Sequence, residues 1–232
     1  MNVDLGNLIL WYVAFLFSVT AHEAAHSFVA MRGGDLTAYL GGQVSLNPVP
    51  HIKRSPFGTV IIPLLSYIYG GWMIGWASAP YDPNWAATYP RKAAWMAAAG
   101  PAANFIILSV AFIIIKLGLL LGVFQAPHSV NISRLITANS DLAVTVATLL
   151  SILFMLNLIL FIFNLFPFPP LDGSQVITLI MGEDTAQRFR QFINQPAMSF
   201  LGIILAWKLF GSVFSGIFSL ILKLIYPSLR YF

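Results

Sequence analysis

The sequence contains no cysteine among its 232 residues. A disulfide framework is therefore excluded, and so is a metal site built on thiolates. Carboxylates are also scarce, since the chain has six Asp and only two Glu, Glu23 and Glu183. Any chemistry that needs acidic groups must therefore use very few positions.

Charge is scarce as well. Charged residues make up 9% of the chain and hydrophobic residues 58%, and the mean hydropathy is +0.81. Soluble domains carry about 25% charged residues, so this composition indicates a chain that is embedded in lipid. The net charge of +4 does not indicate a nucleic-acid partner in so apolar a chain. We expect the lipid bilayer as a partner, no nucleic acid, and basic residues in loops that set the orientation.

Long apolar segments alternate with short polar ones along the chain. About 20 apolar residues suffice for one helical crossing. The apolar segments are Asn7–Met31, Phe57–Ala79, Arg91–Gly122, Leu142–Phe166 and Met198–Tyr226. The last has the length of one tilted span or a tight hairpin, and Gly173–Gln195 before it predicts an amphipathic surface helix. We therefore predict a single domain over residues 1–232 with an all-α fold, a polytopic integral membrane helical bundle of about 4–6 membrane segments.

The segment Phe57–Ala79 is expected to be re-entrant. Lys53 and Arg54 precede it, and Arg91 and Lys92 follow it. Basic residues accumulate in cytoplasmic loops, so a full crossing would put one of these pairs outside. A segment that dips into the membrane and returns removes the conflict, and such backbone is tolerated where protein or water covers it.

One short motif in the first apolar segment points to a metal. His22–His26 reads His-Glu-Ala-Ala-His, and a helix presents positions four residues apart on one face. Neutral imidazole is a good zinc ligand, and Glu23 is placed to take a proton from the attacking water. The alternative is two polar histidines on a buried helix face. Ionisable groups within a bilayer cost about 2.5–3.5 kcal/mol each, which favours the metal site.

Two histidines do not complete such a site, because catalytic zinc usually has three protein ligands. Asp172 is the best candidate for the third. It follows Leu142–Phe166 in a run with three prolines that ends at Gly173, and this run unwinds the helix and frees one carboxylate. From the distribution of Lys and Arg in the loops, we expect Asp172 and the two histidines near the same cytoplasmic face. The alternatives are that Asp172 is a turn residue before glycine, or that Glu183 is the third ligand of a differently built zinc site.

A polar stretch after the first segment predicts a short strand or hairpin near the site. Thr37–Leu46 is rich in glycine and in residues that favour strands. Within it, Gly42, Gln43 and Val44 could offer a strand edge to an extended substrate. The alternative is a short hairpin with no role in substrate binding.

Three separated motifs are similar to those of the site-2 protease family of intramembrane zinc metalloproteases. They are His22–His26 in an apolar helix, the Gly-Pro-Ala-Ala-Asn stretch Gly100–Asn104, and Asn164–Gly173, and the pattern covers residues 8–180. The stretches Leu46–His51 and Gly75–Ala77 resemble the short branch without PDZ or CBS domains. That branch usually has lysine after Gly-Trp-Ala, and here Ser78 stands in its place, so a role for that lysine is not carried over.

The resemblance implies that His22, His26 and Asp172 bind zinc, one ion per chain, and that Glu23 activates the water.

Three further residues have two interpretations each. Asn104, by resemblance, lines the site and polarises the scissile carbonyl as an oxyanion donor, or else it makes an inter-helix hydrogen bond. Asn164 is a second possible donor, or it satisfies backbone freed by Pro167. His51 could approach the site, but a lone loop histidine is more often structural or solvated.

We therefore expect an intramembrane zinc endopeptidase that hydrolyses peptide bonds of membrane-protein substrates within or next to the bilayer. The substrate should carry a transmembrane segment. The protein should be a multi-pass protein of the cell (plasma) membrane, with the active site toward the cytoplasmic side. The alternative is a non-catalytic membrane protein, either a metal transporter or a substrate-binding pseudoprotease. Transporters tend to spread ionisable residues over several helices, whereas here they concentrate in one cluster that includes Glu23.

Overall fold

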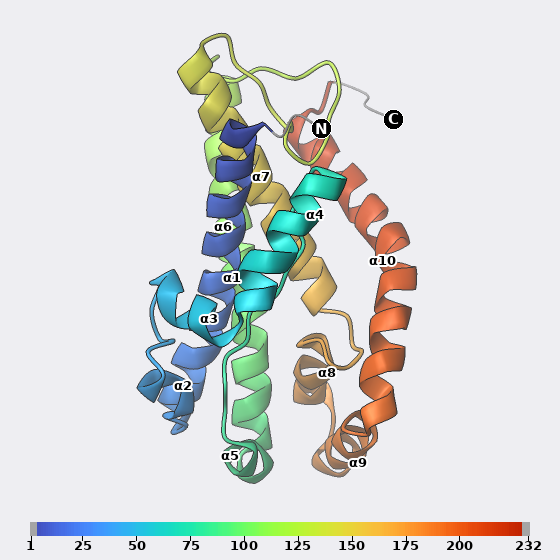
Figure 1. Cartoon of the computed structure of the whole chain (residues 1–232). Coiled ribbons are helices and arrows are strands. Elements are labelled where there is room, and N and C mark those ends of the chain that lie inside the picture. Colours follow the sequence, from blue (N-terminus) through green and yellow to red (C-terminus); the bar gives the residue numbers. More distant parts are fainter. Residues whose placement is uncertain (1–3, 229–232) are drawn as a thin grey trace.

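The computed structural model describes residues 4–228, which fold almost entirely into helices (Figure 1). Four helices among these residues are long and apolar enough to cross a membrane: α1 (Leu5–Gly33), α6 (Pro90–Leu120), α7 (Asp141–Asn164) and α10 (Pro196–Ile225). The prediction of an all-α polytopic bundle is confirmed. Met198–Tyr226 forms the single helix α10 and not a hairpin.

Helices α1, α6 and α7 form the core of the bundle and run alternately down and up it (Figure 1). Small buried residues, among them Ala14, Ala97 and Ala147, let the helices approach closely. Larger side chains such as Phe154 and Ile115 fill the space between them and are also buried.

Helix α10 flanks this core (Figure 1), its Trp207 and Phe210 rings meet Phe163 of α7, and its C-terminal end is held by hydrogen bonds. Lys116 of α6 donates hydrogen bonds to the carbonyl oxygens of Leu224 and Ile225, at 3.0 and 3.2 Å. The Tyr226 hydroxyl donates to the carbonyl oxygen of Leu135 at 2.8 Å. The bonds from Lys116 satisfy carbonyl groups that the end of α10 leaves free.

The segment predicted to be re-entrant turns back on itself. It forms one π-helical turn, η1 (Phe57–Ile61), and the helix α4 (Ile62–Gly70), together about 20 Å long and too short to cross a hydrocarbon core of about 30 Å. Gly71 then adopts φ 74°, and the chain returns in extended form. The backbone N–H of Trp76 donates to the carbonyl oxygen of Gly58 at 3.0 Å. The segment therefore begins and ends at the same level of the bundle, as the re-entrant interpretation requires, and its depth in a bilayer stays a prediction.

The predicted hairpin within Thr37–Leu46 is wrong. The chain forms a short helix, α2 (Thr37–Leu40), followed by a turn. Asp35 accepts hydrogen bonds from the backbone N–H and the hydroxyl of Thr37, at 2.9 and 2.5 Å, and such local bonds stabilise a helical turn in competition with a strand. Within residues 4–228, β pairing is limited to isolated bridges at Gln125–Thr137 and Asn131–Arg134.

Short helices connect the long ones: α3 (Pro48–Arg54), α5 (Pro83–Thr88), α8 (Gly173–Val176), η2 (Ile177–Ile180) and α9 (Glu183–Ile193). The last three replace the single amphipathic helix predicted for Gly173–Gln195. Met181 and Gly182 have extended backbone, which separates η2 from α9.

Candidate metal centre

Helix α1 brings His22 and His26 together on its inner face. Their Nε2 atoms are 2.9 Å apart, and the rings meet edge to face at 82°. Both side chains are buried, as is Glu23 between them in sequence. The helix fixes this pair, because residues four apart lie one above the other on the same face.

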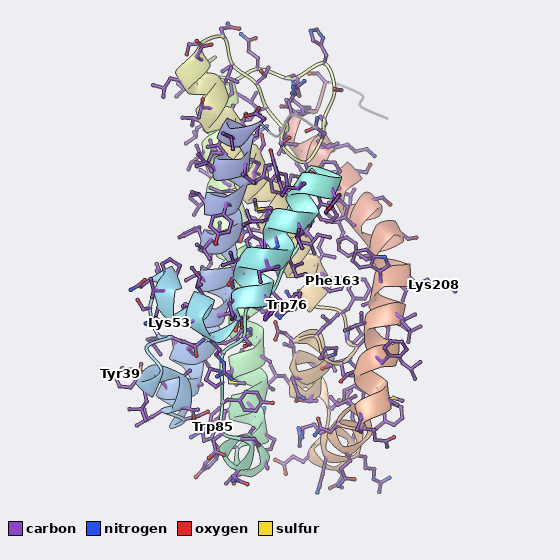
Figure 2. The ribbon with its side chains drawn as sticks, in the orientation of Figure 1. Tyr39, Lys53, Trp76, Trp85, Phe163 and Lys208 are labelled. Atoms are coloured by element: carbon purple, nitrogen blue, oxygen red, sulfur yellow. The ribbon has the colours of Figure 1, made fainter. Side chains whose placement is uncertain are left out.

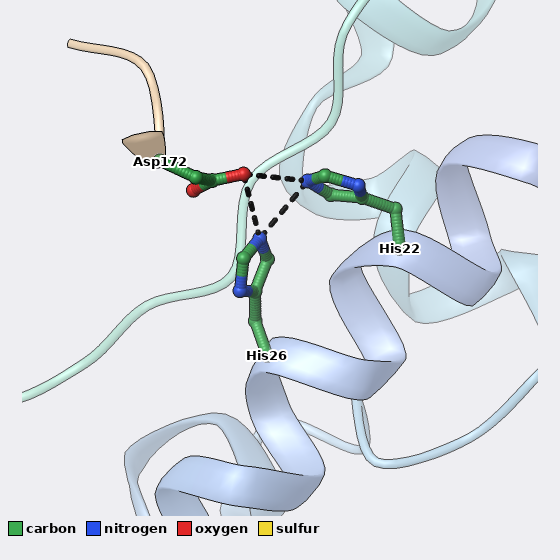
Figure 3. Close-up of side chains that lie close together, drawn as sticks. All are labelled: His22, His26 and Asp172. Carbon is green, nitrogen blue, oxygen red and sulfur yellow. Dashed lines mark hydrogen bonds and ion pairs between the residues drawn. The ribbon is translucent and has the colours of Figure 1, made fainter. Parts of the chain in front are cut away.

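Asp172 reaches the two histidines from the loop that follows α7 (Figure 3). Its Oδ2 atom lies 3.1 Å from Nε2 of His22 and 3.4 Å from Nε2 of His26. Burial alone would raise the pKa of Asp172, but His26 and His22 in their protonated forms outweigh this effect and lower the pKa below its usual range. The carboxyl group is therefore ionised at neutral pH, which is the form that a metal requires.

In the neutral form that binds a metal, the hydrogen bond of each histidine leaves its Nε2 atom without a proton. Nδ1 of His26 is 2.7 Å from the carbonyl oxygen of Met96, which can only accept, so Nδ1 carries the proton. Nδ1 of His22 donates in the same way to Oδ1 of Asn104 at 2.6 Å. Two Nε2 lone pairs therefore face Oδ2 of Asp172, which is buried and receives no hydrogen bond.

Such an arrangement suits a cation. The three acceptor atoms are 2.9 to 3.4 Å apart and repel one another unless a positive charge lies between them. Ligands of tetrahedral zinc with bonds of 2.0–2.1 Å would be separated by about 3.4 Å. The donor set and its spacing therefore fit zinc.

Gly100 leaves the space that such an ion needs. Helix α6 passes beside α1 at this point, and a Cβ atom on Gly100 would collide with Nε2 of His22 and Nε2 of His26. Any other residue would fill the place toward which the ligands point. The glycine of the Gly100–Asn104 motif thus has a steric role.

Behind His22, a chain of hydrogen bonds links three helices. Asn104 of α6 accepts from His22 and donates to Oδ1 of Asn157 on α7 at 2.8 Å, and Asn157 donates to Oγ of Ser18 on α1 at 2.8 Å. All three of these side chains are fully buried. The structure thus places Asn104 behind the ligand and away from the cavity, as an inter-helix hydrogen bond requires and an oxyanion donor does not. Asn157 was not predicted from the sequence, although it and Asn164 are the two amides in the apolar run Leu142–Phe166.

The ligands open into one cavity of about 470 Å³. Glu23 and Asn164 line it, and Asn164 also donates to the carbonyl oxygen of Leu160 at 3.0 Å. Residues 77–81, which belong to no helix or strand, form a second wall. The junction of α9 and α10 closes the far side with Ile193, Asn194 and Ser199. Metal ligands, a carboxylate and an amide therefore share one volume.

The remaining predicted site residues lie outside this cavity, and they are Gly42, Gln43, Val44, His51 and Glu183. The backbone N–H groups of Gly42 and Gln43 donate to the carbonyl oxygens of Tyr39 and Ala38, both at 2.9 Å, so they are not free to pair with a substrate strand. His51 is fully buried, and its Nε2 atom lies 3.1 Å from the carbonyl oxygen of Ser45. Glu183 is exposed at the start of α9 and is not among the three groups that could hold an ion.

Comparison with known proteins agrees with this chemistry. The sequence matches the profile of Peptidase family M50 over residues 10–209. It is 33% identical over 166 residues to "Putative zinc metalloprotease YwhC" of Bacillus subtilis (strain 168), an alignment that covers 71% of this chain and 66% of the relative. It is 27% identical over 168 residues to "Putative zinc metalloprotease Rip2" of Mycolicibacterium smegmatis, which covers 72% of this chain and 56% of the relative.

The matched part of the chain thus spans less than two thirds of the length of either relative. No solved structure matches the chain.

Proposed function

The chain belongs to peptidase family M50, and on that premise we propose that it is a zinc endopeptidase that cuts membrane-protein substrates within or next to the bilayer. The observation that carries the proposal is the convergence of His22, His26 and Asp172 beside Glu23 in one cavity. Residues 4–228 contain one such group of ligands, so we expect one zinc ion per chain. The cavity belongs to a chain with four candidate membrane spans, which supports a substrate in the membrane.

His22, His26 and Asp172 would hold the zinc, which when bound would supply Lewis-acid chemistry for activating a water and the scissile carbonyl group. Glu23 follows a ligand directly in α1 and lines the same cavity. Its carboxylate acts as the general base and then returns the proton to the leaving amine. Asn164 uses one amide N–H for Leu160 and has a second one for the developing oxyanion.

The substrate we propose is a transmembrane segment that unwinds before it is cut, because a helix hides its peptide bonds. Residues 77–81 belong to no helix or strand and line the cavity. This segment, and not Gly42–Val44, is the candidate for main-chain pairing with an extended substrate.

Basic residues support a cytoplasmic orientation of the site. They gather where α1 ends and α6 begins, and on α9 beside that end: Arg32, Arg91, Lys92, Arg188 and Arg190. Lys92 donates to the carbonyl oxygen of Gly33 at 3.0 Å, so the two helix ends meet. Figure 2 shows Lys53 and Trp85 in this same half of the molecule. Because cytoplasmic loops are rich in Lys and Arg, we infer a multi-pass plasma-membrane protein whose site opens toward the cytoplasm.

A cleavage assay with metal removal tests the proposal. The purified protein, in detergent or nanodiscs, is incubated with a panel of single-span membrane proteins, and fragments are identified by mass spectrometry. We expect cleavage that a zinc chelator abolishes and added zinc restores, and no cleavage by His22→Ala. A protein that binds zinc but cuts none of the panel, as a transporter or a pseudoprotease would, refutes the proposal.

A further inference from the structure

Hydrogen bonds connect His22 of α1, through Asn104 of α6, to Asn157 of α7. We propose that Asn157 is a positioning residue for the metal centre, acting through Asn104 on the ligand His22, and this inference rests on the zinc site proposed above. The contacts form an unbroken series: Nδ1 of His22 to Oδ1 of Asn104 at 2.6 Å, Nδ2 of Asn104 to Oδ1 of Asn157 at 2.8 Å, and Nδ2 of Asn157 to Oγ of Ser18 at 2.8 Å. Asn157 is fully buried and does not line the cavity, so it is not in a position to touch a substrate.

The direction of this series is fixed from its far end. The Ser18 hydroxyl donates its one proton to the carbonyl oxygen of Ala14 at 2.7 Å, so toward Asn157 it can only accept. Asn157 must therefore turn its Nδ2 to Ser18, where it also donates to the carbonyl oxygen of Leu153 at 2.8 Å, and its Oδ1 to Asn104. Asn104 in turn must present Oδ1 to His22. The result is a proton on Nδ1 of His22 and a free lone pair on Nε2, the state in which it binds zinc.

The same amide also connects the helices that carry the ligands. His22 and His26 belong to α1, while Asp172 follows the end of α7. Asn157 hydrogen-bonds both to Ser18 of α1 and to Asn104 of α6, so it sets how α7 lies against the histidines. Water cannot replace these bonds, because every side chain in the series behind His22 is fully buried, and an unpaired buried amide is costly.

Substitution of Asn157 tests this role. Asn157→Leu keeps the approximate volume but removes both the acceptor for Asn104 and the donor to Ser18. We expect zinc affinity, measured by chelator competition on the full-length protein, to fall by about 10–100-fold, as loss of an outer partner of a ligating histidine usually causes. The visible spectrum of the Co²⁺-substituted protein should also shift. Ser18→Ala removes only the far acceptor and should give a smaller loss of affinity in the same assay.

Ser151→Ala is the matched control. Ser151 is fully buried on the same helix and accepts a hydrogen bond from the backbone of Leu135 at 2.9 Å, far along the helix from the ligands. The Ser151→Ala variant should have a lower melting temperature, with unchanged zinc affinity and an unchanged spectrum of the Co²⁺-substituted protein. If Asn157→Leu behaves like this control, the residue is merely structural and the inference is overturned. If Asn157→Leu does not accumulate, Ser18→Ala decides by the same two readouts. A wild-type protein that binds no zinc would refute the metal site itself.

Discussion

Glu23 and the histidines beside it have separable roles at the residue scale, because the groups that could hold an ion are His22, His26 and Asp172 alone among the described residues. Glu23→Gln should therefore retain zinc and lose peptide-bond cleavage by about 100-fold or more, the usual contribution of a general base. Zinc content and turnover are measured on the same preparation. Turnover close to that of the wild type would show that another group activates the water.

Gly100 gives a second prediction at this scale. Gly100→Ala removes no ligand, yet its Cβ would collide with both Nε2 atoms, so the protein should lose most of its zinc. Gly118→Ala is the control, because Gly118 lies on the same helix as Gly100 and its Cβ would collide with the ring of Phe124, away from the proposed ligands. Both variants should lower the melting temperature, and only Gly100→Ala should lower the metal content. Equal zinc content in the two variants would mean that the ion lies elsewhere.

The convergence of His22, His26 and Asp172 was predictable from sequence, and the residues that surround them were not. A helix dictates that His22 and His26 meet, and the proline-rich run singles out Asp172, so both signals are local in the chain. The roles of Gly100 and Asn157 depend on which helices pack together and at what height. Three-helix packing is a property of the folded bundle, and no spacing within one segment reveals it.

At the scale of elements, α10 supports the site without contributing a ligand. Gly202 of α10 lies so close to the loop before Asp172 that a Cβ there would collide with the carbonyl oxygen of Pro169. Gly202→Ala should push this loop away and weaken zinc binding, with a cost in stability of about 1–3 kcal/mol for overpacking. Gly211→Ala on the same helix is the control, because nothing lies within 4 Å of its added Cβ. Chelator competition on the two variants measures the effect, and equal zinc affinities would contradict a bracing role for α10.

The long helices were predicted closely and the short elements poorly. Apolar runs of 20 or more residues leave little choice of structure in a bilayer, where every backbone group must be satisfied internally. Thr37–Leu46 has no such constraint. The two hydrogen bonds that Thr37 donates to Asp35 favour a helical turn there. The substrate-pairing strand was predicted within Thr37–Leu46, so the cavity wall formed by residues 77–81 was not predicted.

The orientation of the whole molecule can be tested by cysteine labelling, since the chain has no native cysteine. Single cysteines at Ser45, Asn84 and Ser129 occupy exposed positions. Ser45 and Asn84 flank the re-entrant segment, and Ser129 lies in the loop at the opposite end of the bundle. An impermeant thiol reagent should label only Ser129→Cys in intact cells, and the other two after the cells are opened. Labelling of Asn84→Cys from outside would mean that the segment crosses, which would separate Asp172 from the histidines.

The central claim for the whole molecule is that two distant parts of the chain, α1 and the loop after α7, together hold one metal ion. The zinc content of Asp172→Ala beside that of Glu183→Ala tests it most directly. We predict about one zinc ion per chain in the wild type and in Glu183→Ala. In Asp172→Ala the zinc affinity should fall by more than about 100-fold, the upper range for loss of an outer partner, because a ligand itself is removed, and the zinc content should fall with it. Full zinc content in Asp172→Ala together with its loss in Glu183→Ala would contradict the account.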